Sequence, residues 1–407
     1  MLREDVGFRG FTITDYDDLE LNKAITLPRT FITFKDSKSD GEVATSMITA
    51  GVDMFMISSL DKVNSFIEGT KKYVNYGVLV KRRLDEAVTR VLTVKMAMGL
   101  IEKGNEEPKK EDTTNYPKGS SQNEYQDSLD AVHESLVLLK NDKTVPARGL
   151  LSGIKYVILL GENVETINRQ TKIQLFPNYD NIGMQCGGWS VRWQGVMGNE
   201  YWTGENKAKT NASSILDALK SLQQKNNFEI LYPEYTNTTS QLSILTDREK
   251  FLTDLRVKRD GMNQRNTLII GTFGEWPYAE SDGDVNIPYC KENKEGCLYN
   301  PFSNPYAPTV ERQSLEIRLE EYEKDVISIV RERDSNIPMV SVLLSGRPML
   351  INEIDDVSNS ILAAWLPGTS GGQGIVDALS GSYTLKPNTS GANTLSMDWP
   401  RDMVNID

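Results

Sequence analysis

The sequence is poor in cysteine and histidine, and it lacks the marks of several common protein classes. Its 407 residues include three cysteines and one histidine. No Ser or Cys nucleophile motif accompanies that histidine, His133, so it is interpreted as structural rather than catalytic. No apolar run approaches the roughly 20 residues needed to cross a bilayer, so no membrane span is expected. The first residues, MLRED, contain no apolar signal core.

Positive charge and phosphate-binding motifs are also scarce. The formal net charge is -12, and the basic residues form no stripe. Nucleic acid is therefore not an expected partner. The glycines in residues 371–374 lack the Lys-Ser/Thr of a phosphate-binding loop, so they are interpreted as a packing turn before a helix from Ile375. No cofactor and no metal ion is expected.

Length and composition favour a soluble protein of two domains. With 39% hydrophobic and 25% charged residues, the chain has the composition of a globular protein. It is too long for one ordinary core. Strands alternate with helices in both halves, which predicts a parallel α/β fold.

The first hundred residues contain two clear strands. Residues 7–16 form a strand that ends on acids, first of all Asp15. An acid at the carboxyl end of a strand is where α/β barrels place their chemistry, although a helix N-cap would use the same residue. Residues 42–57 predict a helix, a stop at Gly51 and a second strand. Helices are expected over residues 61–75 and 81–100.

A polar segment, residues 103–123, predicts a linker, and a second α/β region follows it. A helix is expected over residues 125–140, with the apolar run 136–139 buried. The four expected strands are 155–161, 267–271, 339–345 and 361–365, and helices are expected at 213–224 and 315–331.

Acids and aromatics gather directly after the apolar strand at residues 267–271. The stretch GEWPYAESDGD places Glu275, Glu280 and two aspartates beside Trp276 and Tyr278. Rings that stack on a sugar and carboxylates that take its hydroxyls or protons would suit a polyol site. A solvated acidic turn is the alternative.

A glycine-rich stretch, residues 181–195, contains Trp189 and Trp193. Two exposed rings this close in sequence would form a sugar platform, whereas two buried rings would belong to the core.

Two further patterns concern the cell compartment. Cys290 and Cys297 bracket a polar loop, and they could form a disulfide or remain two free thiols. Glycosylation sequons occur at Asn211, Asn237 and Asn388. Together they favour a secreted or lysosomal parent protein.

Seven stretches resemble, in order, segments of one family. They are LREDVGFRGFTITDY, AGVDMFM, RLDEAVTRVLTVKMAMGLIE, ESLVLLKND, QCGGWSVRWQG, GEWPYAESDGD and AAWLPGTSGGQGIVDALSG. The chain resembles part of a family 3 glycoside hydrolase, the β-glucosidase and β-glucan exohydrolase group. The resemblance implies the C-terminal part of a (β/α)8 barrel followed by an α/β sandwich domain with a mostly parallel sheet. The implied boundaries are 1–102 for the barrel part, 103–150 for the linker and entrance helix, 151–384 for the sandwich and 385–407 for a tail.

The resemblance also implies the site. Asp15 matches the nucleophile and Glu280 the acid/base of a retaining glycosidase. Trp193 and Trp189 match rings that hold the leaving-group sugar, and Tyr16 stands where the family usually has tryptophan. Glu275, beside the acid/base, is also expected to contact substrate.

The implied activity is hydrolysis of terminal β-D-glucosyl residues from a β-glucoside or β-glucan oligosaccharide. The family's upstream sugar-gripping motifs do not occur in this sequence, so an upstream barrel half is the expected partner. An inactive fragment or pseudo-enzyme with a sugar-binding second domain is the alternative.

Overall fold

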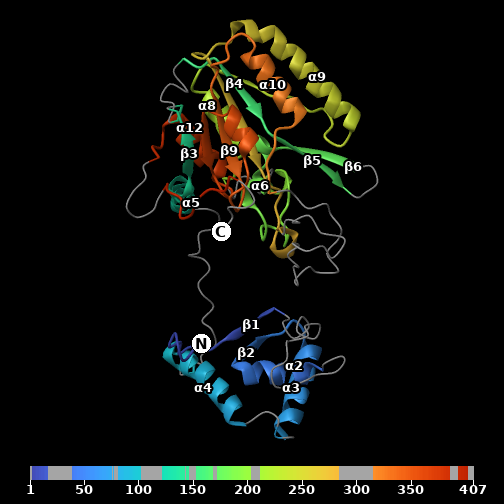
Figure 1. Ribbon diagram of the computed structural model, residues 1–407, viewed down its shortest axis with the longest axis vertical. Helices are drawn as coiled ribbons and strands as arrows, with labels where there is room; N and C mark the ends of the chain where they lie inside the picture. Colours follow the sequence, from blue (N-terminus) through green and yellow to red (C-terminus); the bar gives the residue numbers. More distant parts are fainter. Residues whose placement is uncertain are drawn as a thin grey trace. The chain divides into compact units, whose positions relative to one another are not determined.

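The computed structural model describes residues 2–16, 39–75, 77, 81–101, 122–142, 144–145, 153–167, 172–202, 211–283, 315–385 and 393–401. The chain divides into two units, Met1–Asn115 and Tyr116–Asp407. Each unit is an α/β structure with its own sheet (Figure 1).

The described part of the first unit contains a short parallel sheet with helices. Its elements are β1 (Ile13–Tyr16), α2 (Asp40–Ala50), β2 (Met54–Met56), α3 (Leu60–Asn75) and α4 (Lys81–Ala97). A capping box of Ser39 and Glu42 starts α2, and Gly51, at φ 120°, ends it. The predicted order of helix, glycine and strand in residues 42–57 is confirmed.

A buried carboxylate, Asp53, ties these elements together. Its side chain is fully buried and accepts hydrogen bonds from Arg3 at 2.6 Å, Arg83 at 2.7 Å and Arg90 at 2.9 Å. The backbone N–H of Thr12 donates to it at 3.0 Å. Burial alone would raise the pKa of Asp53, but the Thr12 N–H and the arginines outweigh burial and lower it. The carboxylate therefore stays ionised and joins the start of β1 to α4.

The second unit is built on a six-stranded sheet with the order β3-β10-β9-β8-β4-β7. Among these described strands only β3 runs antiparallel to its neighbour; the other pairs are parallel. The strands are β3 (Val137–Asn141), β4 (Tyr156–Leu160), β7 (Glu229–Leu231), β8 (Thr267–Gly274), β9 (Met339–Leu344) and β10 (Ser360–Ala363). The four predicted strands are confirmed as β4, β8, β9 and β10.

Helices cover both faces of this sheet (Figure 1). They are α5 (Gln122–Ser135), α8 (Ile215–Gln223), α9 (Gln241–Lys258), α10 (Glu321–Arg331), α11 (Asn352–Val357) and α12 (Gly371–Ser380). Along β4, Val157 and Leu159 pack with α8 and α12, whereas Ile158 and Leu160 pack with α9 and α10. Successive residues of a strand point to opposite faces of the sheet. A strand with a hydrophobic core on each face therefore needs an uninterrupted run of apolar residues.

Two predicted helices were wrong in extent. The helix expected to reach Lys140 ends at Ser135, and β3 follows it. Leu138 packs into one core and Leu139 into the other, as the alternation of a strand requires. The helix expected from Leu315 begins only at Glu321. The hairpin of β5 (Glu162–Ile167) and β6 (Lys172–Pro177), the strand β7 and the helix α9 were not predicted.

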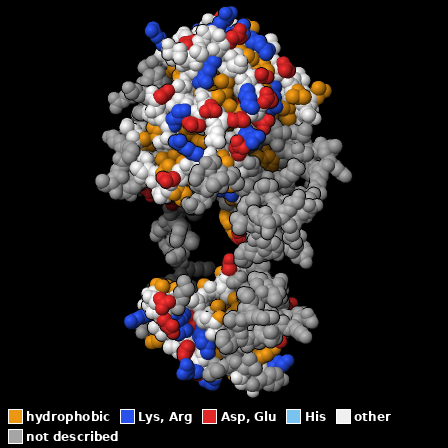
Figure 2. Space-filling model, in the orientation of Figure 1, with side chains coloured by type: hydrophobic (Ala, Val, Ile, Leu, Met, Phe, Trp, Pro, Cys, Tyr) orange, Lys and Arg blue, Asp and Glu red, His pale blue; other side chains and the backbone are white. Residues whose placement is uncertain are grey.

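Charged side chains of both signs are interspersed over the visible face of the second unit (Figure 2). Among the helices in the described part of the chain, none is both long and apolar enough to cross a bilayer.

Candidate functional site

The carboxyl ends of β8 and β9 form the base of the candidate site. These strands pair in register from Ile269 with Met339 to Gly274 with Leu344. The backbone continues the pairing, because the Glu275 N–H donates to the Leu344 carbonyl at 3.1 Å. Residues that directly follow both strands therefore meet, as is usual at the carboxyl edge of a parallel sheet.

Glu275 lies buried in this corner, with 4% of its surface exposed. Its carboxylate accepts from Ser345 Oγ at 2.6 Å, from Arg347 Nε at 3.0 Å and from the Tyr278 hydroxyl at 3.3 Å. The pKa of Tyr278 is raised to about 12, by burial first and then by the charge of Glu275. A sugar contact with Glu275, as the sequence analysis predicts, would require one of these bonds to open.

Glu280 is exposed and stands at the start of a short 3-10 helix, Glu280–Gly283. Its backbone has φ 52°, in the left-handed region that most residues avoid. The loop between Glu275 and Glu280 thus starts in a buried network and ends with an accessible carboxyl group.

The paired tryptophans lie on a loop that follows α6 (Ile182–Cys186). Trp189 is 70% exposed and Trp193 is 52% exposed. Their ring centroids are 6.2 Å apart, with 58° between the ring planes. The Trp189 N–H donates to the Trp193 carbonyl at 2.8 Å, which closes the loop. Both rings are therefore surface rings, and the interpretation of two core tryptophans is wrong.

The tryptophan loop packs directly on the loop that carries Glu280. The Ala279 N–H donates to Gln194 Oε1 at 2.7 Å. A Cβ atom on Gly188 would lie 1.9 Å from the Tyr278 carbonyl oxygen, so no other residue fits there without a shift. The tryptophan loop and the loop that carries Glu280 are consequently in direct contact within the second unit.

Asp15 and Tyr16 lie in the first unit, at the end of β1. Both are exposed, and Asp15 Oδ1 accepts from the Tyr16 N–H at 2.7 Å. Tyr16 pairs with Met56 of β2, and the register of the two strands shifts between Ile13 and Tyr16. Asp15 therefore stands at the carboxyl end of a parallel strand, rather than at a helix N-cap. Asp15 and Glu280 belong to different units.

Sequence reasoning missed Ser345 and Arg347, the partners of Glu275. Both follow β9, some 70 residues beyond Glu275, in a stretch that was assigned only a strand. The available signal was the polar Ser-Gly-Arg directly after an apolar strand, the same pattern that drew attention to residues 274–284.

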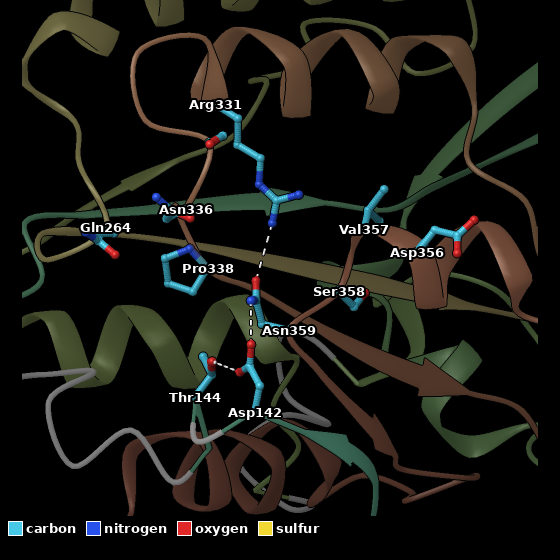
Figure 3. Close-up of a pocket in the computed structure, with 11 residues that line it drawn as sticks. Asp142, Thr144, Gln264, Arg331, Asn336, Pro338, Asp356, Val357, Ser358 and Asn359 are labelled. Atoms are coloured by element: carbon cyan, nitrogen blue, oxygen red, sulfur yellow. Dashed lines mark hydrogen bonds between the residues drawn. The ribbon is translucent and has the colours of Figure 1, made fainter.

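A separate polar cavity of about 450 Å³ lies at the opposite edge of the sheet (Figure 3). Pro338 precedes β9 there, and Asn359 precedes β10. Asn359 donates to Asp142 at 2.6 Å, and Thr144 donates to the other oxygen of that carboxylate at 2.6 Å. None of the predicted site residues lines this cavity.

The predicted thiol pair, Cys290 and Cys297, lies outside the described residues. Cys186, at the end of α6, is half-buried, and burial raises the pKa of its thiol to about 12. In the described ranges, no group of three or more His, Cys, Asp or Glu residues could hold a metal ion.

Comparison with known proteins identifies the family. Residues 136–407 match the glycosyl hydrolase family 3 C-terminal domain. The chain belongs to glycosyl hydrolase family 3. The fold is consistent with solved members: a β-glucosidase from Listeria innocua in complex with isofagomine aligns over 94% of this chain and 40% of its own, with a TM-score of 0.58 and 21% identity. An exo-1,3/1,4-β-glucanase from a Pseudoalteromonas species aligns over 97% of this chain and 48% of its own, with a TM-score of 0.56 and 25% identity.

Two curated relatives carry β-glucosidase names. A lysosomal β-glucosidase of Dictyostelium discoideum is 26% identical over 94% of this chain and 37% of its own length. A periplasmic β-glucosidase of Salmonella typhimurium is 26% identical over 100% of this chain and 44% of its own length. The chain thus spans less than half the length of these family 3 relatives.

Proposed function

We propose that the chain carries the catalytic carboxyl groups of a retaining β-glucosidase that removes terminal, non-reducing β-D-glucosyl residues from glucosides or glucan oligosaccharides. The observation that carries the proposal is the corner in the second unit. There the loop that carries the exposed Glu280 packs against the loop that carries two exposed rings, Trp189 and Trp193. An acid beside a stacking platform is what departure of a sugar leaving group requires.

In the proposed reaction, Asp15 attacks the anomeric carbon while Glu280 protonates the departing glycosidic oxygen. The bond between the anomeric carbon and that oxygen breaks, and a glycosyl ester to Asp15 forms. Glu280, now ionised, takes a proton from water as the water cleaves the ester, which restores both carboxyl groups. Retaining enzymes place the two groups about 5 Å apart. Tyr16, exposed beside Asp15, would contact the sugar with its ring.

The proposed substrate is a β-linked glucoside because the two curated relatives described above are named β-glucosidases. The relatives include a lysosomal and a periplasmic protein, and the sequons at Asn211 and Asn237 fall in the described part of the chain. We therefore propose a secreted or lysosomal location for the parent protein.

Activity is proposed to need further barrel strands in the first unit. Its described sheet has two strands, β1 and β2, and it exposes Tyr16, Met54 and Met56. An apolar sheet surface of this kind is normally covered. The proposed cover is an upstream barrel half.

A direct test compares the purified chain with the chain co-produced with the N-terminal half of a family 3 β-glucosidase, assayed on an aryl β-glucoside. Turnover is expected only with the added half. Within that active complex, Asp15→Ala should abolish turnover. Glu280→Ala should slow poor leaving groups by about 10² to 10⁴, spare activated aryl glucosides and respond to azide. Equal loss on both substrate types without azide rescue would contradict the role of Glu280.

The second candidate is a sugar-binding unit without catalysis. It is favoured by one observation: both rings of the tryptophan platform belong to the second unit, independent of Asp15. Sugar-induced change in tryptophan fluorescence, in a complex that never turns over substrate, would support it.

A further inference from the structure

Arg347 connects both ends of the loop that carries Glu280. At the first end its Nε lies 3.0 Å from Oε1 of the buried Glu275. At the other end, one terminal nitrogen of Arg347 donates to the carbonyl of Gly283 at 2.6 Å. Gly283 is the last residue of the 3-10 helix. Between them the guanidinium carbon lies 4.8 Å from the centroid of the Tyr278 ring. One planar cation thus contacts the beginning, the middle and the end of residues 275–283.

This set of contacts suits arginine and no other residue. The guanidinium fork pairs with a carboxylate while a second edge donates elsewhere, and its face stacks on an aromatic ring. A lysine has one charged nitrogen and could satisfy only part of the set. The ring of Tyr278 is itself confined, since a Cβ atom on Gly283 would lie 2.3 Å from it. The loop has little freedom while Arg347 is in place.

We propose that Arg347 is a positioning residue for the acid/base. Through Glu275, Tyr278 and Gly283 its guanidinium holds the Glu280 carboxyl group where a departing glycosidic oxygen can take its proton. The hydrogen bond from Ala279 to Gln194 extends this control to the tryptophan platform. The inference rests on the proposed role of Glu280 and adds the residue that sets its geometry. On this view Glu275 acts through Arg347 rather than by touching sugar.

The loop can loosen without unfolding the unit, and this makes the inference testable. Both hydrophobic cores lie on the sheet faces, and the apolar residues of the loop, Trp276 to Ala279, belong to neither of them. The first test therefore follows amide hydrogen exchange in the full chain, comparing Arg347→Gln with Arg333→Gln. Arg333 is an exposed arginine of the same unit that pairs with Asp260 at 3.2 Å. Arg333→Gln therefore removes the same charge as Arg347→Gln without touching the loop.

Arg347→Gln is expected to speed exchange across residues 275–283, including the Ala279 amide, by about tenfold or more, because charge-assisted hydrogen bonds are lost. Exchange in β4 and β9 should stay as in the wild type, and Arg333→Gln should change neither region. Unaltered exchange of residues 275–283 in Arg347→Gln would overturn the inference.

The second test uses the active complex and varies the leaving group. Arg347→Gln should lower kcat about 10- to 100-fold on a β-glucan disaccharide, since a small displacement of a catalytic group costs this much. An activated aryl glucoside should be hydrolysed within about threefold of the wild type, because it needs little protonation. Arg347→Lys, which keeps the charge and part of the contact set, should recover part of the loss.

The outcomes separate this inference from the proposed function. If Glu280→Ala lacks the leaving-group effect, the proposed acid/base role fails. If Glu280→Ala shows that effect and Arg347→Gln loses both substrates equally, or neither, the acid/base role stands and the positioning role of Arg347 fails.

Discussion

The two units of the chain hold together in different ways. The second unit packs two hydrophobic cores, one on each face of its sheet. In the described part of the first unit, the buried apolar residues are few: Val43, Ala44, Ile48 and Ala87. Its strongest internal tie is a charge cluster, one carboxylate with three arginines. One unit is therefore stabilised chiefly by burial of apolar area, and the other depends on ions withdrawn from water.

The difference extends to the exposed apolar side chains. In the second unit the largest of them form the tryptophan pair. In the first unit they are spread over several elements and include Tyr16, Met56, Val88 and Met96. A charge cluster fixes the direction of strands and helices but covers little apolar surface. The described part of the first unit thus combines a defined internal geometry with several exposed apolar side chains.

The largest effect is expected from Asp53→Ala, which breaks the tie of the first unit. Removing the carboxylate takes away the counter-charge of Arg83 and leaves Arg90 with Glu86 alone, at 3.8 Å. Loss of one partner from a buried ion pair costs about 3–5 kcal/mol. Limited proteolysis and hydrogen exchange should show opening of residues 39–101, with the second unit unchanged.

Leu159→Ala is the matched change in the other unit. Leu159 is fully buried in one of the two cores, and its truncation should lower the stability of the second unit by about 2–5 kcal/mol. The first unit should keep its protection from exchange. If either substitution opened both units together, the contrast in how they are stabilised would not hold.

A smaller effect should appear as a dependence of the second unit on pH. Glu323 of α10 is buried, and burial raises its pKa to about 8, with the charge of Glu162 adding to the shift. The pKa in the folded state is above the ordinary value of 4.5, so the associated stability is complete below pH 4.5 and is lost as pH rises towards 8. Glu323→Gln mimics the neutral form and should remove this dependence.

The measurement is the free energy of unfolding of the second unit at pH 6 and pH 8. From pH 6 to pH 8 the wild type should lose about 2 kcal/mol of stability that Glu323→Gln does not lose, since one pKa unit corresponds to about 1.4 kcal/mol. Glu321→Gln, on the exposed side of the same helix turn, is the control. A constant difference between variant and wild type at both pH values would show that Glu323 is already ionised at pH 6.

The smallest change in stability is expected from Trp189→Ala. The ring is exposed, so the free energy of unfolding should move by no more than about 0.5 kcal/mol. Affinity for a β-linked glucose disaccharide, followed by fluorescence of the remaining tryptophans, should fall about three- to tenfold because a stacking face is lost. A large loss of stability would mean that the pair serves packing rather than sugar binding.

The sequence predicts the central strands of the second unit well because β4, β8, β9 and β10 are apolar on both faces. It fails for α9, whose apolar residues do not share one side. Leu242 and Val257 are exposed on this helix, whereas Phe251 and Leu255 are buried. The three residues of β7 are too few to show any period. The apolar run before residue 140 is compatible with a helix or a strand. It forms the strand β3 because it lies between two cores and contributes side chains to both.

The sequence predicts the residues of the candidate site that would act on substrate. It does not predict the residues that hold their loops in place. Glu280 and the tryptophans stand out by residue type and motif. Arg347 does not, since its contact with Glu275 depends on the adjacency of β8 and β9, which local sequence does not encode. The roles of Asp15 and Glu280 remain predictions until the two carboxyl groups are tested together.

The place of β3 has a consequence for the order of events during synthesis. Among the described strands it pairs only with β10, and the Ser360 hydroxyl donates to the Asn141 side chain across 219 positions of sequence. A ribosome adds roughly 5–20 residues per second, so β3 waits about 10–45 seconds for its partner. During that interval an apolar strand has left the ribosome without a neighbour. A chaperone that binds nascent extended segments would find a target in Val137–Asn141 long before the sheet of the second unit is complete.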